Sequence, residues 1–247
     1  MAWWYAVVES RHELQNPTSA EKILLLGEQL GLDGTSRVLD IAGGRGGPAL
    51  LLAREFGCRI TSVELSAEFA AVARARALEA GLAPLIEVVE SDAKDFPIEE
   101  GAYDAALCLG ASFAFDGLVP TVEALARAVG RGRPIAVGEP FWREWPLPAD
   151  VPVSDAAIGA EDFVPLPLTV ERFESAGVEV VSLIASSQDD WDRYESLHWL
   201  TLDEWLAANP DHPQAEEFRA RGRQSRDRYL RWRRDLLDWA IFVCRVP

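Results

Sequence analysis

Cysteine is scarce in this sequence, with only three residues among 247. They are Cys58, Cys108 and Cys244, and their odd number and wide spacing match neither a disulfide framework nor a metal-binding motif. Each one lies in or beside an expected strand. We therefore expect all three to be buried in the core, and we expect no metal site.

Basic residues are also in short supply. The chain has 24 Lys and Arg against 40 Asp and Glu, which gives a net charge of −16. A nucleic-acid groove needs a positive field, so this balance argues against a nucleic-acid partner. It also disfavours binding to anionic membrane surfaces.

Long apolar runs are missing as well. The sequence contains no stretch of 18 apolar residues, which argues against a transmembrane helix. Its opening residues, MAWWYAVVESR, have neither the basic start nor the long apolar centre of a signal peptide. We therefore expect a cytoplasmic protein with no membrane partner.

What is present is enough apolar material, 49% of the chain, for one large α/β domain. Expected strands alternate with expected helices, which is typical of a doubly wound, Rossmann-like parallel sheet. The expected strands cover residues 37–41, 59–63, 86–89, 103–109, 134–137, 178–184 and 239–246. The expected helices cover residues 20–30, 47–57, 67–81, 121–129 and 170–176, with Ser19 and Ser66 as N-caps, an ordered loop or insertion over 141–167, and a charged, Trp-rich helical stretch over 188–234.

The most informative segment is VLDIAGGRGG, residues 38–47, together with Glu64 at the end of the next strand. Glycine allows positive φ and lets a ligand approach the backbone closely. The helix that follows offers unpaired N–H groups at its N-terminus. A carboxylate at position 64 can bind both hydroxyls of a ribose. These features predict a site for a nucleoside-type cofactor at the carboxyl ends of parallel strands.

The pattern D-x-A-x-G-x-G over residues 40–46 resembles the D-x-G-x-G-x-G loop of class I S-adenosylmethionine-dependent methyltransferases. Glu64 is similar to their ribose-binding acid, Asp92 to their adenine-contacting acid, and residues 103–112 to their fourth strand, which borders the methionine part of the cofactor. The resemblance covers residues 20–140. It implies S-adenosylmethionine as cofactor, bound by Asp40, Ala42, Gly43, Gly44, Gly46, Glu64, Leu65, Asp92, Ala93 and Leu109.

Within that family the chain is most similar to UbiE-like small-molecule methyltransferases. The resemblance implies a single domain over residues 1–247, with a seven-stranded mixed sheet whose last strand is antiparallel. It further implies an N-terminal lid over residues 1–20 and a helical insertion over residues 188–235. We expect methyl transfer to a small-molecule acceptor by a monomer or homodimer.

One departure from the family pattern and the roles of several residues are open at this stage. Ala42 stands where the family has glycine, and the turn survives if Ala42 keeps negative φ. Asp40 either contacts the cofactor or braces the loop through backbone N–H bonds. The catalytic candidates are His12, whose ordinary pKa lies near neutrality, and Glu139, which follows the fifth strand.

Aromatic residues are the candidates for enclosing the acceptor, and they indicate an apolar or aromatic small molecule. An aromatic stripe at helical spacing, such as that of the helix with Trp191, Tyr194 and His198, more often forms core, so packing is the competing interpretation there. The predicted substrate residues are Trp4, Tyr5, Phe113, Trp142, Trp191, Tyr194 and His198.

Three alternatives stay open. Residues 44–49 match the G-x-G-x-x-A pattern of nicotinamide dehydrogenases, although Asp40 interrupts the strand end where that fold prefers apolar residues. A non-catalytic, ligand-sensing or dimerising member of the same fold is the second alternative. The third is a protein that uses the sulfonium for another reaction, such as decarboxylation or rearrangement.

Overall fold

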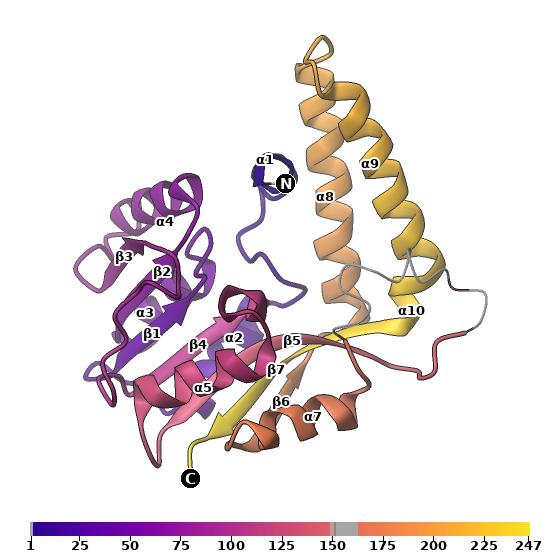
Figure 1. The fold of residues 1–247 in the computed structure, drawn as a ribbon. Helices are drawn as coiled ribbons and strands as arrows, with labels where there is room; N and C mark the ends of the chain where they lie inside the picture. Colours follow the sequence, from indigo (N-terminus) through magenta and orange to yellow (C-terminus); the bar gives the residue numbers. More distant parts are fainter. Residues whose placement is uncertain (1, 149–150, 152–162) are drawn as a thin grey trace.

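The computed structural model describes residues 2–148, 151 and 163–247. Seven strands form one sheet in the order β3-β2-β1-β4-β5-β7-β6, and β7 runs antiparallel to both of its neighbours. This confirms the doubly wound mixed sheet (Figure 1). The strands are β1 (Arg37–Ile41), β2 (Arg59–Glu64), β3 (Ile86–Glu90), β4 (Ala105–Leu109), β5 (Pro134–Trp142), β6 (Glu179–Ala185) and β7 (Leu237–Arg245).

Helices cover both faces of the sheet. Ser19 caps α2 by accepting a hydrogen bond from the Lys22 amide, and Ser66 caps α4 by accepting one from the Phe69 amide, both at 3.3 Å. The three cysteines are buried in the resulting cores, as expected. On one face lie α2 (Ala20–Gln29), α3 (Gly47–Phe56) and α4 (Ala67–Glu79), and on the other α5 (Leu118–Val129), α7 (Leu166–Ser175) and the short η1 (Ser112–Phe115).

The Trp-rich stretch before the last strand forms a helical hairpin that projects from the sheet (Figure 1). Helix α1 (Ala2–Val8) packs beside it through a small core that includes Trp4 and Phe218. The hairpin consists of α8 (Gln188–Ala208) and α9 (Ala215–Arg228), followed by the short π-helix η2 (Tyr229–Arg233) and by α10 (Arg234–Leu236).

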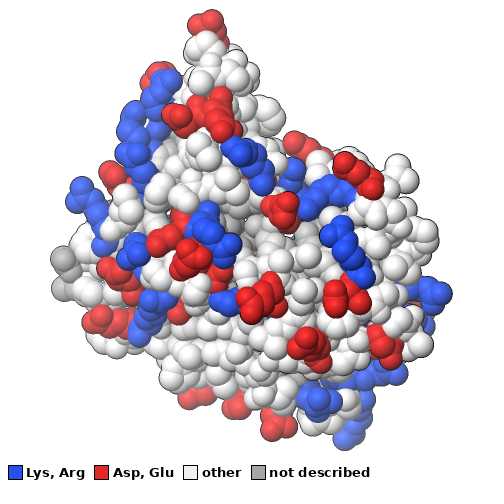
Figure 2. All heavy atoms as spheres, turned by 180° about the vertical axis from the view of Figure 1, so that it is seen from behind, with Lys and Arg blue, Asp and Glu red and all other residues white. Residues whose placement is uncertain are grey.

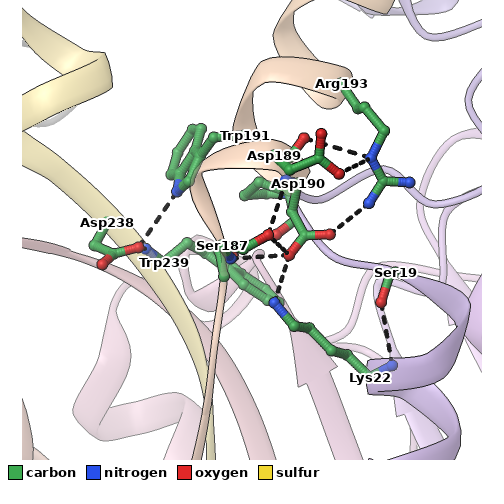
Figure 3. Close-up of polar contacts among 11 residues, drawn as sticks. Ser19, Lys22, Ser187, Asp189, Asp190, Trp191, Arg193, Asp238 and Trp239 are labelled. Carbon is green, nitrogen blue, oxygen red and sulfur yellow. Dashed lines mark hydrogen bonds and ion pairs between the residues drawn. The ribbon is translucent and has the colours of Figure 1, made fainter.

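A buried carboxylate holds the start of α8 against α2 (Figure 3). The Asp190 carboxylate accepts a hydrogen bond from the Ser187 amide at 2.8 Å, and the Asp190 amide donates to the Ser187 hydroxyl oxygen at 3.1 Å, which together form a capping box. Asp190 also pairs with Lys22 of α2 and with Arg193. Although burial alone would raise the pKa of Asp190, the bonds from Lys22 and Ser187 lower it.

Several boundaries differ from those expected. Strand β4 begins at Ala105 rather than 103, and β5 continues to Trp142 although Pro140 lies within it. Pairing with β7 keeps β5 extended through these residues. Phe141 and Trp142 are therefore strand rather than loop, while residues 149–150 and 152–162 of the expected 141–167 insertion lie outside the described residues. In the part of the chain that the structure describes, no helix has both the length and the hydropathy needed to cross a bilayer.

Candidate functional site

The Gly-rich loop, residues 42–47, joins β1 to α3. Ala42 has a φ of 55°, which corrects the expectation of a negative value, so an alanine occupies the left-handed region here. A Cβ on Gly43 would overlap Ser62 and approach Asp40 Oδ2 to 2.8 Å. The backbone of this loop therefore lies directly against the ends of β1 and β2, where the Ser62 and Asp40 side chains leave no room for a Cβ at position 43.

Glu64 ends β2 and shapes this loop. Its Oε2 accepts a hydrogen bond from the Gly44 amide at 2.8 Å, and its Oε1 accepts one from the Ser66 amide at 2.7 Å. Each carboxylate oxygen still has a lone pair for a further donor. Leu65, which follows, is largely exposed.

Asp40 is buried beside Glu64 and accepts a hydrogen bond from the Ser62 hydroxyl at 3.3 Å. Burial raises the pKa of Asp40 to about 7; the Ser62 bond opposes the rise and the nearby Glu64 carboxylate adds to it. Within the described residues, no backbone N–H binds Asp40. The bracing role considered for Asp40 is thus performed by Glu64.

The remaining predicted cofactor residues lie at the same edge of the sheet. The Ser91 amide donates to the Glu64 carbonyl, which places Asp92 and the buried Ala93 beside the end of β2. Asp92 Oδ1 accepts a hydrogen bond from the Lys94 amide at 2.9 Å, so it forms a local turn and does not cap a long helix. Leu109 ends β4.

A segment that we call the N-terminal strap, residues 9–16, crosses this edge. Gln15 Oε1 accepts a hydrogen bond from the Arg45 amide at 2.7 Å, and Asn16 Nδ2 donates to the Leu109 carbonyl at 3.0 Å. The Arg45 guanidinium donates to the Ser10 carbonyl at 2.8 Å. Sequence reasoning missed Gln15 and Asn16; only their place in the expected lid pointed to them.

The strap also reaches α8 through a polar cluster of four residues: Glu9, His12, Tyr194 and His198. The rings of His12 and His198 stack with centroids 4.3 Å apart, and the Tyr194 hydroxyl donates to Glu9 Oε1 at 3.2 Å. His12 Nε2 lies 3.0 Å from the Tyr194 carbonyl. Because a carbonyl only accepts, Nε2 carries the proton and Nδ1 the lone pair.

His12 is 4% exposed, and its Nδ1 has no hydrogen-bond partner among the described residues. Burial lowers the pKa of His12 to about 4, and the adjacent His198 contributes to the decrease. The imidazole is therefore neutral near pH 7. A buried, neutral imidazole with an unused lone pair can accept a hydrogen bond or a proton from a ligand.

Three predicted substrate residues pack into hydrophobic cores instead: Trp4, Trp142 and Trp191. Trp4 meets Phe218 edge-on with centroids 5.2 Å apart, and Trp191 stacks on Tyr229 at 6.4 Å. These three tryptophans are therefore core residues. Tyr194 and His198, which lie on α8 together with Trp191, face the strap instead.

The other candidates occupy separate surroundings. Tyr5 is partly buried, and burial together with Glu9 raises its pKa. Phe113 on η1 is largely exposed. Glu139 is buried in β5, and it is one of the groups that raise the pKa of Cys108, after burial itself. The polar cluster contains His12 and excludes Glu139, so the structure does not bring the two catalytic candidates together there.

A groove of about 770 Å³ lies behind the strap, between α3, the end of α4 and α8. His12, Asn16 and Tyr194 line it, whereas Glu64 and Asp92 are not among its described lining residues. Charges of both signs are interspersed over the rear face of the molecule (Figure 2). Within the described residues, no three His, Cys, Asp or Glu side chains gather so that they could hold a metal ion.

The chain is similar in sequence to known methyltransferases. A family model described as a methyltransferase domain matches residues 38–132, from β1 past α5. YjhP of Escherichia coli (strain K12), an uncharacterized protein, is 33% identical over 239 residues, which cover 97% of this chain and 96% of YjhP.

Two solved structures have nearly the same fold along their whole length. A SAM-dependent methyltransferase from Thiobacillus denitrificans superposes with a TM-score of 0.90 at 36% identity, covering 98% of each chain. One from Geobacter sulfurreducens gives a TM-score of 0.92 at 35% identity, covering 100% of this chain and 99% of the other. Both were crystallised with S-adenosyl-L-homocysteine.

The Gly-rich loop and the ends of β1 and β2 together form the expected cofactor site, which we call the crevice. Its residues suit the same kind of ligand. Gly43 lets the loop pack closely against Ser62 and Asp40, and the helix N-terminus of α3 follows directly. The Glu64 carboxylate retains lone pairs for hydroxyl donors, and Glu64 and Asp92 provide negative charge at this edge of the sheet for a cationic group.

Proposed function

Because this chain belongs to the class I S-adenosylmethionine-dependent methyltransferases, we propose that it transfers a methyl group to a small molecule bound between the strap and α8. The cofactor supplies a methyl group already activated on a sulfonium. Glu64 would bind the ribose hydroxyls, Asp92 the adenine, and the Gly-rich loop with Asp40 the methionine part. A nicotinamide cofactor is set aside, since S-adenosylmethionine is the cofactor.

The observation that carries the small-molecule proposal is the position of the strap. It is hydrogen-bonded to the Gly-rich loop and to the end of β4 on one side, and to α8 on the other. A crevice roofed in this way has little room for a folded macromolecule. The groove of about 770 Å³ shares His12 and Tyr194 with the polar cluster, and its volume is that of small-molecule sites.

His12 is the residue that we propose to act on the acceptor. Its Nδ1 lone pair is fixed by the Nε2 bond to the Tyr194 carbonyl. That lone pair can orient an acceptor O–H or N–H and can take its proton as the new bond to carbon forms. The protein's main task is to hold the acceptor atom in line with the transferred methyl. The catalytic role of Glu139 stays a second prediction, and it is independent of the role proposed for His12.

The proposal is tested by measuring release of S-adenosylhomocysteine in the presence of small amines, phenols, thiols and carboxylic acids. We expect turnover with at least one class and a large decrease in kcat for His12→Asn. Glu64→Ala serves as the control for lost cofactor binding. Micromolar cofactor affinity without turnover of any acceptor would instead favour the non-catalytic alternative.

A further inference from the structure

Gln15 connects the strap to the backbone of the Gly-rich loop. Its Oε1 accepts the Arg45 amide hydrogen at 2.7 Å, and the same oxygen occupies the space where a side chain on Gly44 would begin. Gly44 has a φ of 58°, so glycine is needed here both for conformation and for this close approach. The position of the loop is therefore tied to the position of one side chain on the strap.

Glu9 extends this connection toward α8. Gln15 Nε2 donates to Glu9 Oε2 at 2.6 Å, and the Tyr194 hydroxyl donates to Glu9 Oε1 at 3.2 Å. The result is one unbroken series of hydrogen bonds from Tyr194 through Glu9 and Gln15 to the Arg45 amide, which we call the relay. All three of its hydrogen bonds are at least partly shielded from water.

The chemistry of the relay depends on pairing one side-chain amide with one carboxylate, and in this chain the amide is Gln15. The backbone N–H of Arg45 needs an acceptor and the Glu9 carboxylate needs a donor, and a side-chain amide supplies one of each in a fixed orientation. A bond to an ionised carboxylate is stronger than one between neutral groups. Glu9 also lies 3.7 Å from His198 Nε2, so the relay ends inside the polar cluster.

We propose that Gln15 and Glu9 are positioning residues that couple the Gly-rich loop to the acceptor side of the site. A change at Tyr194 is transmitted through Glu9 and Gln15 to the loop that holds the cofactor. By thermodynamic reciprocity, an occupied cofactor crevice then favours the arrangement of Tyr194 and His12 in which an acceptor is received. This inference rests on the proposed function, because it takes the polar cluster as the acceptor side.

The first experiment measures S-adenosylhomocysteine affinity by calorimetry in a double-mutant cycle. Tyr194→Phe removes only the distant hydroxyl, and we expect affinity to fall about threefold. In a Gln15→Ala background, the same change should have no further effect. The matched control is Tyr229→Phe. The Tyr229 hydroxyl donates to Asp192, which lies on α8 like Tyr194, but it does not belong to the relay. This variant should leave the affinity for S-adenosylhomocysteine unchanged.

The second experiment is a reciprocal exchange that separates positioning from simple structural support. Gln15→Glu keeps an acceptor for the Arg45 amide but places two carboxylates together, and affinity should fall about tenfold. Adding Glu9→Gln restores a donor opposite the new carboxylate and an acceptor for the Tyr194 hydroxyl, so affinity should recover. Thermal melting of each variant identifies any that fails to fold.

The proposal is overturned if Tyr194→Phe lowers affinity equally in both backgrounds, leaves it unchanged in the wild type, or if the exchange fails to restore binding in a folded protein. These outcomes are independent of the acceptor, since S-adenosylhomocysteine alone is the probe. If the proposal for the relay fails, the methyltransferase proposal therefore still stands. If no acceptor is methylated, the affinities of the double-mutant cycle can still be interpreted.

Discussion

Asp40 and His12 are both buried, and their pKa values are displaced toward the neutral form of each group. Burial raises the pKa of Asp40 to about 7 and lowers the pKa of His12 to about 4. Each group therefore makes folding depend on pH, and the two dependences have opposite signs over the same acidic range.

Asp40 makes the protein less stable as pH increases. Between about pH 4 and 7 the unfolded chain releases this proton while the folded chain keeps it, so the free energy of unfolding falls. We expect the free energy of unfolding of Asp40→Asn, relative to that of the wild type, to be about 2–3 kcal/mol higher at pH 8 than at pH 5. Urea titrations without ligand across this range provide the measurement. Parallel profiles for the two proteins would show that Asp40 is not protonated in the folded state.

His12 has the opposite effect. As pH falls from about 6.5 to 4, the unfolded chain binds a proton that the folded chain rejects, and stability decreases. The free energy of unfolding of His12→Gln, relative to that of the wild type, should therefore be about 2 kcal/mol higher at pH 5 than at pH 7. The same urea titrations test this, and a pH-independent difference between the two proteins would contradict it.

Ala42 offers a third test at this scale. An L-residue in the left-handed region is strained, and glycine is not. Ala42→Gly relieves this strain, but it also adds conformational entropy to the unfolded chain. We expect a net increase of about 0.5–1 kcal/mol in the free energy of unfolding. Thermal unfolding decides the sign, and a lower melting temperature would argue against strain at this position.

The Gly-rich loop and the acids at the strand ends were predictable because glycines and acids at these places follow from chain geometry, whereas their binding of the cofactor stays a prediction. The φ of Ala42 was not, since alanine prefers negative φ and only the surrounding turn imposes the other value. Nor were the partners of Gln15 and Glu9: hydrogen bonds between a strap and a helix more than 180 residues away leave no local sequence signal.

Among the elements, α8 is held at its start by the buried Asp190. Asp190 is only 3% exposed in its side chain and binds Lys22, Ser187 and Arg193 (Figure 3). Asp190→Asn should lower the free energy of unfolding by about 2–3 kcal/mol, because Lys22 loses its charged partner in a partly buried site. Equilibrium urea unfolding provides the measurement.

Asp189 is the natural control for this change. It lies in the same first turn of α8 and also pairs with Arg193, but its side chain is 81% exposed. Asp189→Asn should therefore cost no more than about 0.5 kcal/mol. Equal losses for the two variants would show that burial of Asp190 is unimportant.

Element boundaries were predictable where caps and glycines mark them, as at Ser19, Ser66 and Gly57. They were missed where long-range pairing decides. The sequence Gly138-Glu139-Pro140 predicts the end of a strand, yet β7 holds β5 extended to Trp142. Helix α1 was missed because its stability comes from packing against α8 and α9, which no local pattern reveals.

For the whole molecule, binding in the crevice should be felt well beyond the Gly-rich loop. At a concentration of S-adenosylhomocysteine one hundred times its Kd, the protein should gain about 2.7 kcal/mol in stability. Hydrogen exchange should slow in residues 9–16 as well as in residues 42–47, because the two segments are hydrogen-bonded. Unchanged exchange in the strap, with protection of the loop, would show that the strap moves independently.

The position of β7 has a consequence for biosynthesis. It is the last strand in chain order, yet it lies between β5 and β6. While the nascent chain emerges from the ribosome, both of those strands expose unpaired edges, and the gap between them is filled only after residue 245 has left the exit tunnel. Completion of the sheet is therefore delayed until this segment has been translated, and during that interval the two open edges are the places where chaperones or neighbouring nascent chains would bind.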